Sequence, residues 1–292
     1  MPELKPKAKG SLTVDNHGIA FSAKSGRYDV PWAEIAAVSS ANERVELWGT
    51  TGRIVRMVIP NGGGLAAATV MHHKVNELTV EFHDIRGAYH GAVFFLPAAD
   101  AAHVMESSTL AVPSLNDPIA MAVSAPKPSI SCQGASGLAG AVLVSPPTWT
   151  EADVPAAYRA AVYEHIIDRL KKVQGVTHVY RAGEPDTQPV CPQFTISISV
   201  VSFKPGNQVA RASMGPIGFF AKTTQLVFDA TITDVSGHFN KTEPLKATVR
   251  GESESLTIAD SVAKRLAKLY VNDLKQFNRG GSLNAPTPPH AL

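Results

Sequence analysis

The fold is decided by residues 141–175, AVLVSPPTWTEADVPAAYRAAVYEHIIDRLKKVQG. The stretch opens with an apolar run of strand length, which two prolines end. Thr148 and Glu151 then have the spacing of a capping box, which predicts that a helix begins there. Apolar side chains recur behind it at three- and four-residue steps; they are Val154, Tyr158, Ala161, Val162, Ile166, Leu170 and Val173. Gly175 predicts the end of this helix.

The segments that follow extend this unit into a sheet. Residues 176–180 predict a second strand, and three alternating segments predict antiparallel strands at 194–200, 226–232 and 245–249. Residues 257–260 predict the cap of a last helix. Its apolar face is formed by Val262, Leu266, Leu269 and Leu274. The order of these elements predicts an α+β domain with two helices over residues 139–280, followed by a disordered tail at 281–292.

A loop of small residues, ARASMGPIG at 210–218, comes before the central hairpin of this domain. Together with the order of elements, it resembles the N-terminal domain of TolB and an uncharacterised bacterial lipoprotein-like family. Asp229 and Asp234 fall where the hairpin of those proteins keeps acidic residues. Members of these families are exported, often through a lipidated cysteine. This chain departs from them because no such signal is recognised in it, so the resemblance is not expected to extend to a role in the envelope.

Residues 1–107 predict a separate, mostly-β domain. Apolar residues alternate on both sides of the turn 15–18, Asp-Asn-His-Gly, which is typical of a hairpin. Apolar residues 35–38 and 45–47 predict two further strands, and residues 54–59, 78–82 and 92–96 predict three more. Pro97 precedes a helical stretch at 98–105.

The string YDVPWAEIAAV at 28–38, and FFL at 94–96 ahead of a helix, resemble bacterial pleckstrin-homology-like domains. The resemblance implies a small β-barrel with a C-terminal helix. Residues 108–138 contain four prolines and few large apolar side chains, which is typical of a linker. A length of 292 residues is consistent with two domains, and we expect only modest contact between them.

The net charge and the length of the apolar runs limit which partners the sequence predicts. A net charge of +2 gives no reason to expect nucleic acid. No run approaches the ~18 apolar residues of a membrane helix, so an integral membrane protein is not expected, whereas surface contact with a membrane stays open. No signal peptide precedes the first domain, and this favours a cytoplasmic location. The two cysteines, Cys132 and Cys191, are then more simply two free thiols, although the sequence leaves their pairing open.

The sequence predicts neither catalysis, nor a cofactor, nor a bound metal. Nucleophile motifs such as G-x-S-x-G and H-E-x-x-H do not occur. If the strands around 78–83 and 90–96 pair, His83 and His90 could face each other and hold a metal with His72 or Asp84, but surface histidines are the preferred interpretation. Asp229 and the pair Glu164-His165 are interpreted as solvated.

Two candidate contact sites remain. The segment around Gly215 and Pro216 carries large apolar groups that are hard to bury locally, namely Met214, Ile217, Phe219 and Phe220, and it predicts an interface. Basic residues that could contact an anionic ligand are Lys24, Arg27, Arg53 and Arg56. The predicted function is non-catalytic binding or scaffolding through protein contacts or self-association. Lipid or small-ligand binding by the first domain is the alternative, and an enzyme of unknown class is the third.

Overall fold

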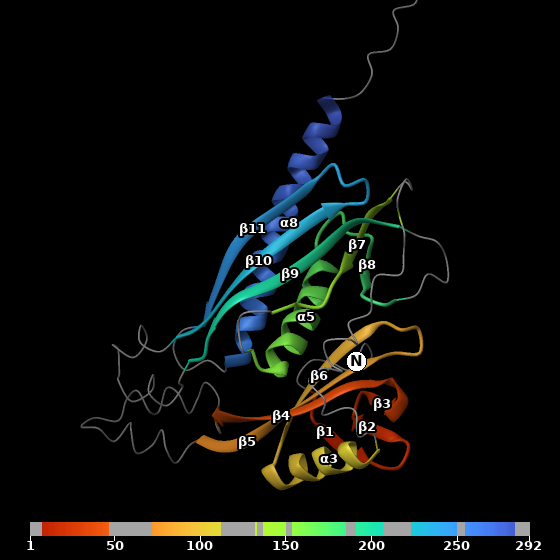
Figure 1. The fold of residues 1–292 in the computed structure, drawn as a ribbon, viewed down its shortest axis with the longest axis vertical. Helices are drawn as coiled ribbons and strands as arrows, with labels where there is room; N and C mark the ends of the chain where they lie inside the picture. Colours follow the sequence, from red (N-terminus) through yellow and green to blue (C-terminus); the bar gives the residue numbers. More distant parts are fainter. Residues whose placement is uncertain are drawn as a thin grey trace, which may run out of the picture.

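A computed structural model describes residues 8–46, 72–111, 132, 137–149, 154–184, 191–206, 223–249 and 255–283. These residues form two modules: the first module comprises the described residues of 8–111, and the second those of 137–283. Figure 1 shows the first module, in red to yellow, below the second module, in green to blue.

The first module begins with a three-stranded antiparallel sheet. Its strands are β1 (Gly10–Val14), β2 (Gly18–Ala23) and β3 (Gly26–Pro31). The predicted hairpin turn is confirmed, because the Asp15 carboxylate accepts hydrogen bonds from the backbone N–H groups of His17 at 2.7 Å and Gly18 at 3.2 Å. A 3₁₀ turn, η1 (Trp32–Glu34), leads out of β3, and the Trp32 indole donates to the Asp15 carbonyl.

A second antiparallel sheet and a helix complete the first module. They are β4 (Ile35–Glu46), β5 (His72–His83), β6 (Tyr89–Leu96) and α3 (Ala98–Ala111). The two sheets and α3 share one core, formed by Ile19, Val30, Trp32, Ile35, Val38, Leu78, Val80, Phe82 and Val104.

The strands of the first module differ in part from those that the sequence predicts. The two predicted strands at 35–38 and 45–47 overlap a single long strand, β4. The predicted strand at 54–59 lies outside the described residues. The expected closed barrel is wrong for the described residues, because their six strands form two separate three-stranded sheets.

The second module is an α+β unit, as predicted. Its elements are β7 (Leu138–Val144), α5 (Ala156–Leu170), β8 (His178–Arg181), β9 (Pro192–Lys204), β10 (Thr224–Asp234), β11 (Asn240–Val249), η3 (Ser255–Thr257) and α8 (Ile258–Leu283). The sheet has the order β11-β10-β9-β7-β8, in which β7 is parallel to both its neighbours and the rest is antiparallel. Pro244 lies in the middle of the edge strand β11.

Both helices of the second module pack on one face of this sheet (Figure 1). β10 buries every second residue, so Phe228 and Ala230 enter the core between sheet and helices. Asp229 is half-buried on the opposite face, which the described helices do not cover, in a row with Ser199 and Pro244. The neighbouring row carries Ser197, Thr231 and Thr242, so this face is rich in hydroxyl groups.

The start of α5 differs from the prediction. The helix begins at Ala156 behind Pro155, because Thr148 pairs instead with the sheet. Its backbone N–H donates to the Ile198 carbonyl at 2.9 Å, and its carbonyl accepts from Val200 at 2.7 Å. The capping-box spacing was therefore misleading, since the chain first continues along β9 before it turns into the helix.

Candidate functional site

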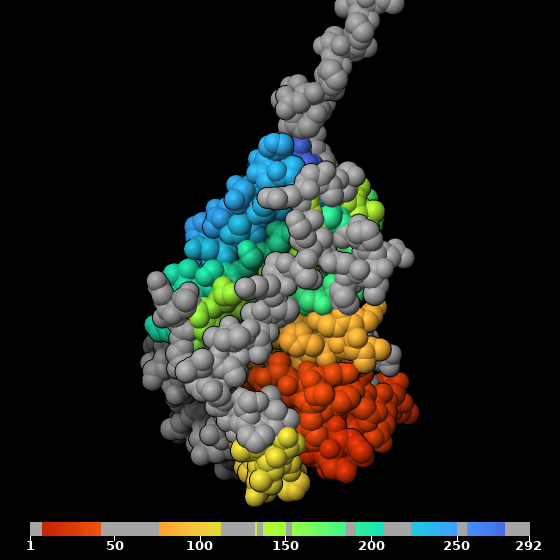
Figure 2. All heavy atoms as spheres, turned by 45° about the vertical axis from the view of Figure 1, so that its right-hand side comes forward, coloured from red at the N-terminus to blue at the C-terminus, as the bar shows by residue number. Residues whose placement is uncertain are grey.

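The two modules meet where α5 of the second module packs against β5 and β6 of the first. In Figure 2 the orange residues of β5 and β6 lie between the red part of the first module and the second module. Buried and half-buried polar groups concentrate here. We call this contact the module junction; it consists of Glu81, Tyr89 and Gly91 from the first module and of Arg159, Ala160, Tyr163, Glu164, Arg181 and Ala182 from the second.

One ion pair crosses the junction directly. The Arg159 guanidinium donates two hydrogen bonds of 2.5 Å to the two carboxylate oxygens of Glu81. The Tyr89 hydroxyl donates a third, 2.7 Å long, to the same carboxylate. Burial, together with the charge of Glu81, raises the pKa of Tyr89 well above its usual value, so this hydroxyl remains a donor. Arg159 also lies over the ring of Trp149, 4.6 Å from its centroid.

A second ion pair, between Glu164 and Arg181, lies within the second module, and both of its residues also bond to the first module. Arg181 donates two hydrogen bonds of 2.7 Å to Glu164 and one of 3.0 Å to the carbonyl oxygen of Tyr89. Glu164 accepts a further bond from the backbone N–H of Gly91 at 3.1 Å. Although burial alone would raise the pKa of Glu164, its bonds and proximity to Arg181 lower it overall. Glu164 is therefore a carboxylate at neutral pH.

Close packing accompanies these bonds. A Cβ atom on Gly91 would lie 2.5 Å from the Cβ of Ala160, so only glycine allows β6 to approach α5 this closely. The Tyr89 ring meets the Tyr163 ring edge-on, with centroids 5.0 Å apart, and it belongs to the core of the second module. The backbone N–H of Tyr89 donates to the Ala182 carbonyl at 2.9 Å. The ring of Tyr89, its hydroxyl and both of its main-chain polar groups therefore all make contacts at the junction.

One residue of this junction does not lie where we predicted. Glu164 was interpreted as solvated, whereas it binds Arg181 and Gly91; its neighbour His165 is exposed. The apolar periodicity of α5 revealed only the face toward its own sheet. Ala157 and Ala160, small residues outside that pattern, were the available signal for a second packed face.

The register of β5 with β6 does not bring His83 and His90 face to face. The register pairs Phe82 with His90 and His83 with Tyr89, so His83 and His90 are not opposite each other. His90 is buried, stacks on Phe82 and lies 3.4 Å from a carboxylate oxygen of Asp84. Within the described ranges, no three His, Cys, Asp or Glu side chains converge as metal ligands; the side chain of His72 is not among those described.

His90 instead predicts a dependence of stability on pH. Its Nδ1 atom is buried, has no hydrogen-bond partner among the described residues, and lies 3.9 Å from Glu164. Burial, and then the charge of Arg181, lower its pKa to about 4, against the opposing effects of Glu164 and Asp84. The unfolded chain takes up this proton near pH 6.5, so the unfolded state binds more protons between about pH 6.5 and 4.

Acidification through this window is therefore expected to lower the free energy of unfolding, by about 3 kcal/mol at its lower end. Urea melts at a series of pH values measure this loss. His90→Gln should flatten the dependence, whereas His178→Gln, at an exposed position, should preserve it. An unchanged slope in His90→Gln would mean that other groups cause the dependence.

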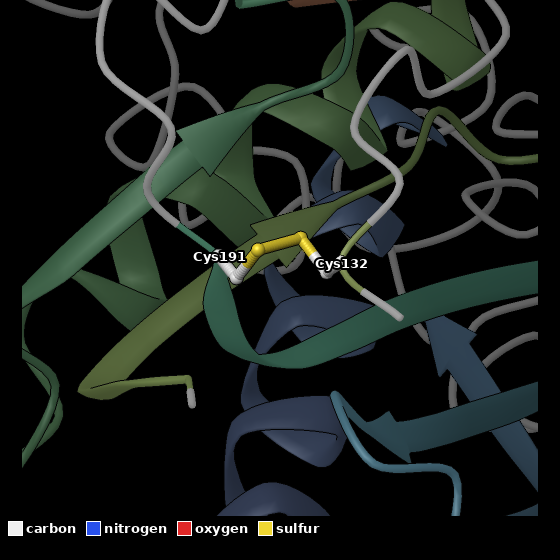
Figure 3. The surroundings of a disulfide bond; sticks show 2 residues. All are labelled: Cys132 and Cys191. Carbon is white, nitrogen blue, oxygen red and sulfur yellow. A yellow bond between two sulfur atoms is a disulfide. The ribbon is translucent and has the colours of Figure 1, made fainter. Parts of the chain in front are cut away.

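Cys132 and Cys191 form a disulfide, with Cα atoms 5.6 Å apart (Figure 3). The preferred interpretation as two free thiols was therefore wrong. The bond joins the residue before the start of β9 to a residue ahead of β7. Since β7, α5 and β8 lie between the two cysteines, the disulfide closes a loop that contains this strand-helix-strand unit.

The candidate ligand contacts are only partly placed. Lys24 lies in the turn between β2 and β3, and Arg27 follows in β3. Arg27 pairs with Asp29 at 2.7 Å, with both side chains 59% exposed, so its charge is locally balanced. Arg53 and Arg56 lie outside the described residues, as do all four interface candidates, Met214, Ile217, Phe219 and Phe220. None of the described helices combines the length and apolar character needed to cross a bilayer.

Comparisons with known proteins bear on this chain only weakly. No family model matches it, and neither does any curated protein sequence. Among solved structures, it is similar to a PelC dodecamer from Paraburkholderia phytofirmans, at 19% identity and a TM-score of 0.30, over 45% of this chain and 91% of the other. The lipoprotein GNA1162 from Neisseria meningitidis is similar at 10% identity and a TM-score of 0.27, over 47% and 98%.

A third structure, of an uncharacterised protein, is 9% identical with a TM-score of 0.27, over 48% of this chain and 94% of the other. The pleckstrin-homology-like resemblance has no counterpart among these three structures. Likeness at this level identifies no activity, ligand or partner for the chain.

Proposed function

We propose that the chain is a non-catalytic binding or scaffolding protein that acts through protein contacts or self-association. The observation that supports this is the module junction. Its charged groups are engaged with one another, through Glu81 with Arg159 and Glu164 with Arg181. They favour one arrangement of the two modules, and a preferred arrangement presents its surfaces to a partner at a smaller entropic cost than a flexible one.

The disulfide supports a location for this function. Disulfides persist in oxidising compartments and are rare in the cytosol. The pairing of Cys132 with Cys191 therefore favours such a compartment over the cytoplasm that we expected. Lipid or small-ligand binding by the first module gains no support from Arg27, because Asp29 already neutralises it.

The contact segment proposed from the sequence, Met214, Ile217, Phe219 and Phe220, provides the test. Phe219→Ser is expected to weaken self-association in sedimentation experiments. It should lower the free energy of unfolding by less than about 1 kcal/mol, as for a surface site. Val201→Ser is the matched control, because Val201 is apolar and 43% exposed on β9. Unchanged association together with a loss of several kcal/mol would show that Phe219 belongs to a core instead.

A further inference from the structure

We propose that the module junction also forms between two copies of the chain, with the first module of one copy docked on the second module of another. This inference rests on the proposed function. It names the partner, a second copy, and the surface, which is the junction already described within one chain.

The first reason is that the junction joins two modules that have separate cores and separate sheets. Their cores are distinct, and only Tyr89 of the first module enters the core of the second. No sheet is shared between them in the part of the chain that the structure describes. One backbone hydrogen bond, from Tyr89 to Ala182, joins the end of one sheet to the edge of the other.

The second reason is the chemistry of the exposed faces once they separate. Undocking would remove Arg159 from Glu81, and Arg181 from the Tyr89 carbonyl, and would expose the Tyr89 ring. Tyrosine and arginine anchors with a paired charge are characteristic of specific protein interfaces. Each exposed face is complementary to the other face of the same junction. A second copy of this chain carries that other face, so it is the occupant that fits.

The third reason is the length of the connection. The first module ends with α3 at Ala111, and the chain is fastened to the second module again at Cys132 by the disulfide. Residues 112–131 between them can span at most ~70 Å when extended. Such a tether gives docking within one chain an effective concentration in the millimolar range. Exchange between copies should therefore appear at high protein concentration, or when docking within one chain is blocked.

A charge-reversal experiment separates the two arrangements. Glu81→Arg and Arg159→Glu each place like charges together within one chain, which opens the junction. In an equimolar mixture, however, the two variants can form two matched junctions across copies. The mixture is expected to sediment as a dimer, with an apparent association constant at least tenfold above that of either variant alone. A chain carrying both changes should remain as monomeric as the unmodified protein at the same concentration.

Circular dichroism of each variant establishes that its modules remain folded. A mixture of folded variants that sediments as two monomers would overturn the proposal. If the unmodified chain nevertheless self-associates, the proposed function stands and only exchange at the junction fails. If the unmodified chain is monomeric at every concentration while the mixture dimerises, exchange is supported and the proposed function loses its support.

A second measurement uses the unmodified chain and does not depend on these variants folding. Tyr89 and Tyr163 lie with ring centroids 5.0 Å apart, close enough for photochemical dityrosine cross-linking. In a mixture of ¹⁴N- and ¹⁵N-labelled chains at high concentration, peptides that join Tyr89 to Tyr163 should carry both labels. Dilution should leave only same-label pairs. Same-label pairs alone at every concentration would show that the junction forms only within one chain.

Discussion

Replacement of both cysteines, as Cys132→Ser with Cys191→Ser, is expected to lower the free energy of unfolding by about 4 kcal/mol. The bond joins residues separated by 59 positions, so its loss lets the unfolded chain explore many more conformations. The folded state should change little, because the backbone N–H of Leu138 still donates to the carbonyl of residue 191. Urea melts measure the loss, and the slope of stability against urea should rise as the unfolded state expands.

A dithiol reductant provides the control. It should reproduce the loss in the unmodified chain and leave the double serine variant unaffected. A reduced chain that unfolds at the same urea concentration as the oxidised one would show that the disulfide contributes nothing to stability. Alkylation of free thiols in native cells, before lysis, would separately test the proposed oxidising compartment.

Arg181→Met is expected to cost about 3 kcal/mol, near the lower end of the range for breaking a buried ion pair. The change removes two bonds to Glu164 and one to the Tyr89 carbonyl, and leaves a carboxylate that has lost its partner. The lower end applies because the Glu164 side chain keeps 22% exposure. Thermal and urea unfolding of the full chain measure the effect.

The matched variant is Arg181→Met with Glu164→Leu. Apolar replacement of both partners of a buried pair often costs much less than removal of one, so the double variant should be more stable than Arg181→Met alone. A loss below about 1 kcal/mol in the single variant would indicate a pair screened by solvent. Equal losses in the single and double variants would show that the bond to Tyr89, and not the ion pair, carries the effect.

Local sequence patterns predicted most of the second module because its strands and helices each have one buried face. The alternation around Phe228 and Ala230 placed Asp229 on the sheet face opposite the core, where the structure has it. The order of strands and helices followed from short segments and turns. By contrast, Thr148 and Glu151 have the spacing of a helix cap, but spacing cannot show that Thr148 has a sheet partner, Ser199, 51 residues away.

The junction could not be predicted for a related reason. A charge on an amphipathic helix is compatible with water, and nothing local distinguishes Arg159 from a solvated arginine. Its partner Glu81 is 78 residues away, on a strand of the other module. The two cysteines were equally ambiguous, because two thiols separated by 59 positions carry no spacing rule that fixes their pairing.

Pro244 has a consequence for how copies of the chain can accumulate. A proline has no N–H to offer, and on the edge strand β11 it interrupts the row of donors that an added strand would need. At the opposite edge, β8 is only four residues long and its end is met by Tyr89. The five-stranded sheet is therefore poorly suited to growth by strand addition, the route to amyloid-like fibres. At high concentration, copies of this module should therefore associate through side-chain contacts, and the assemblies should dissociate on dilution.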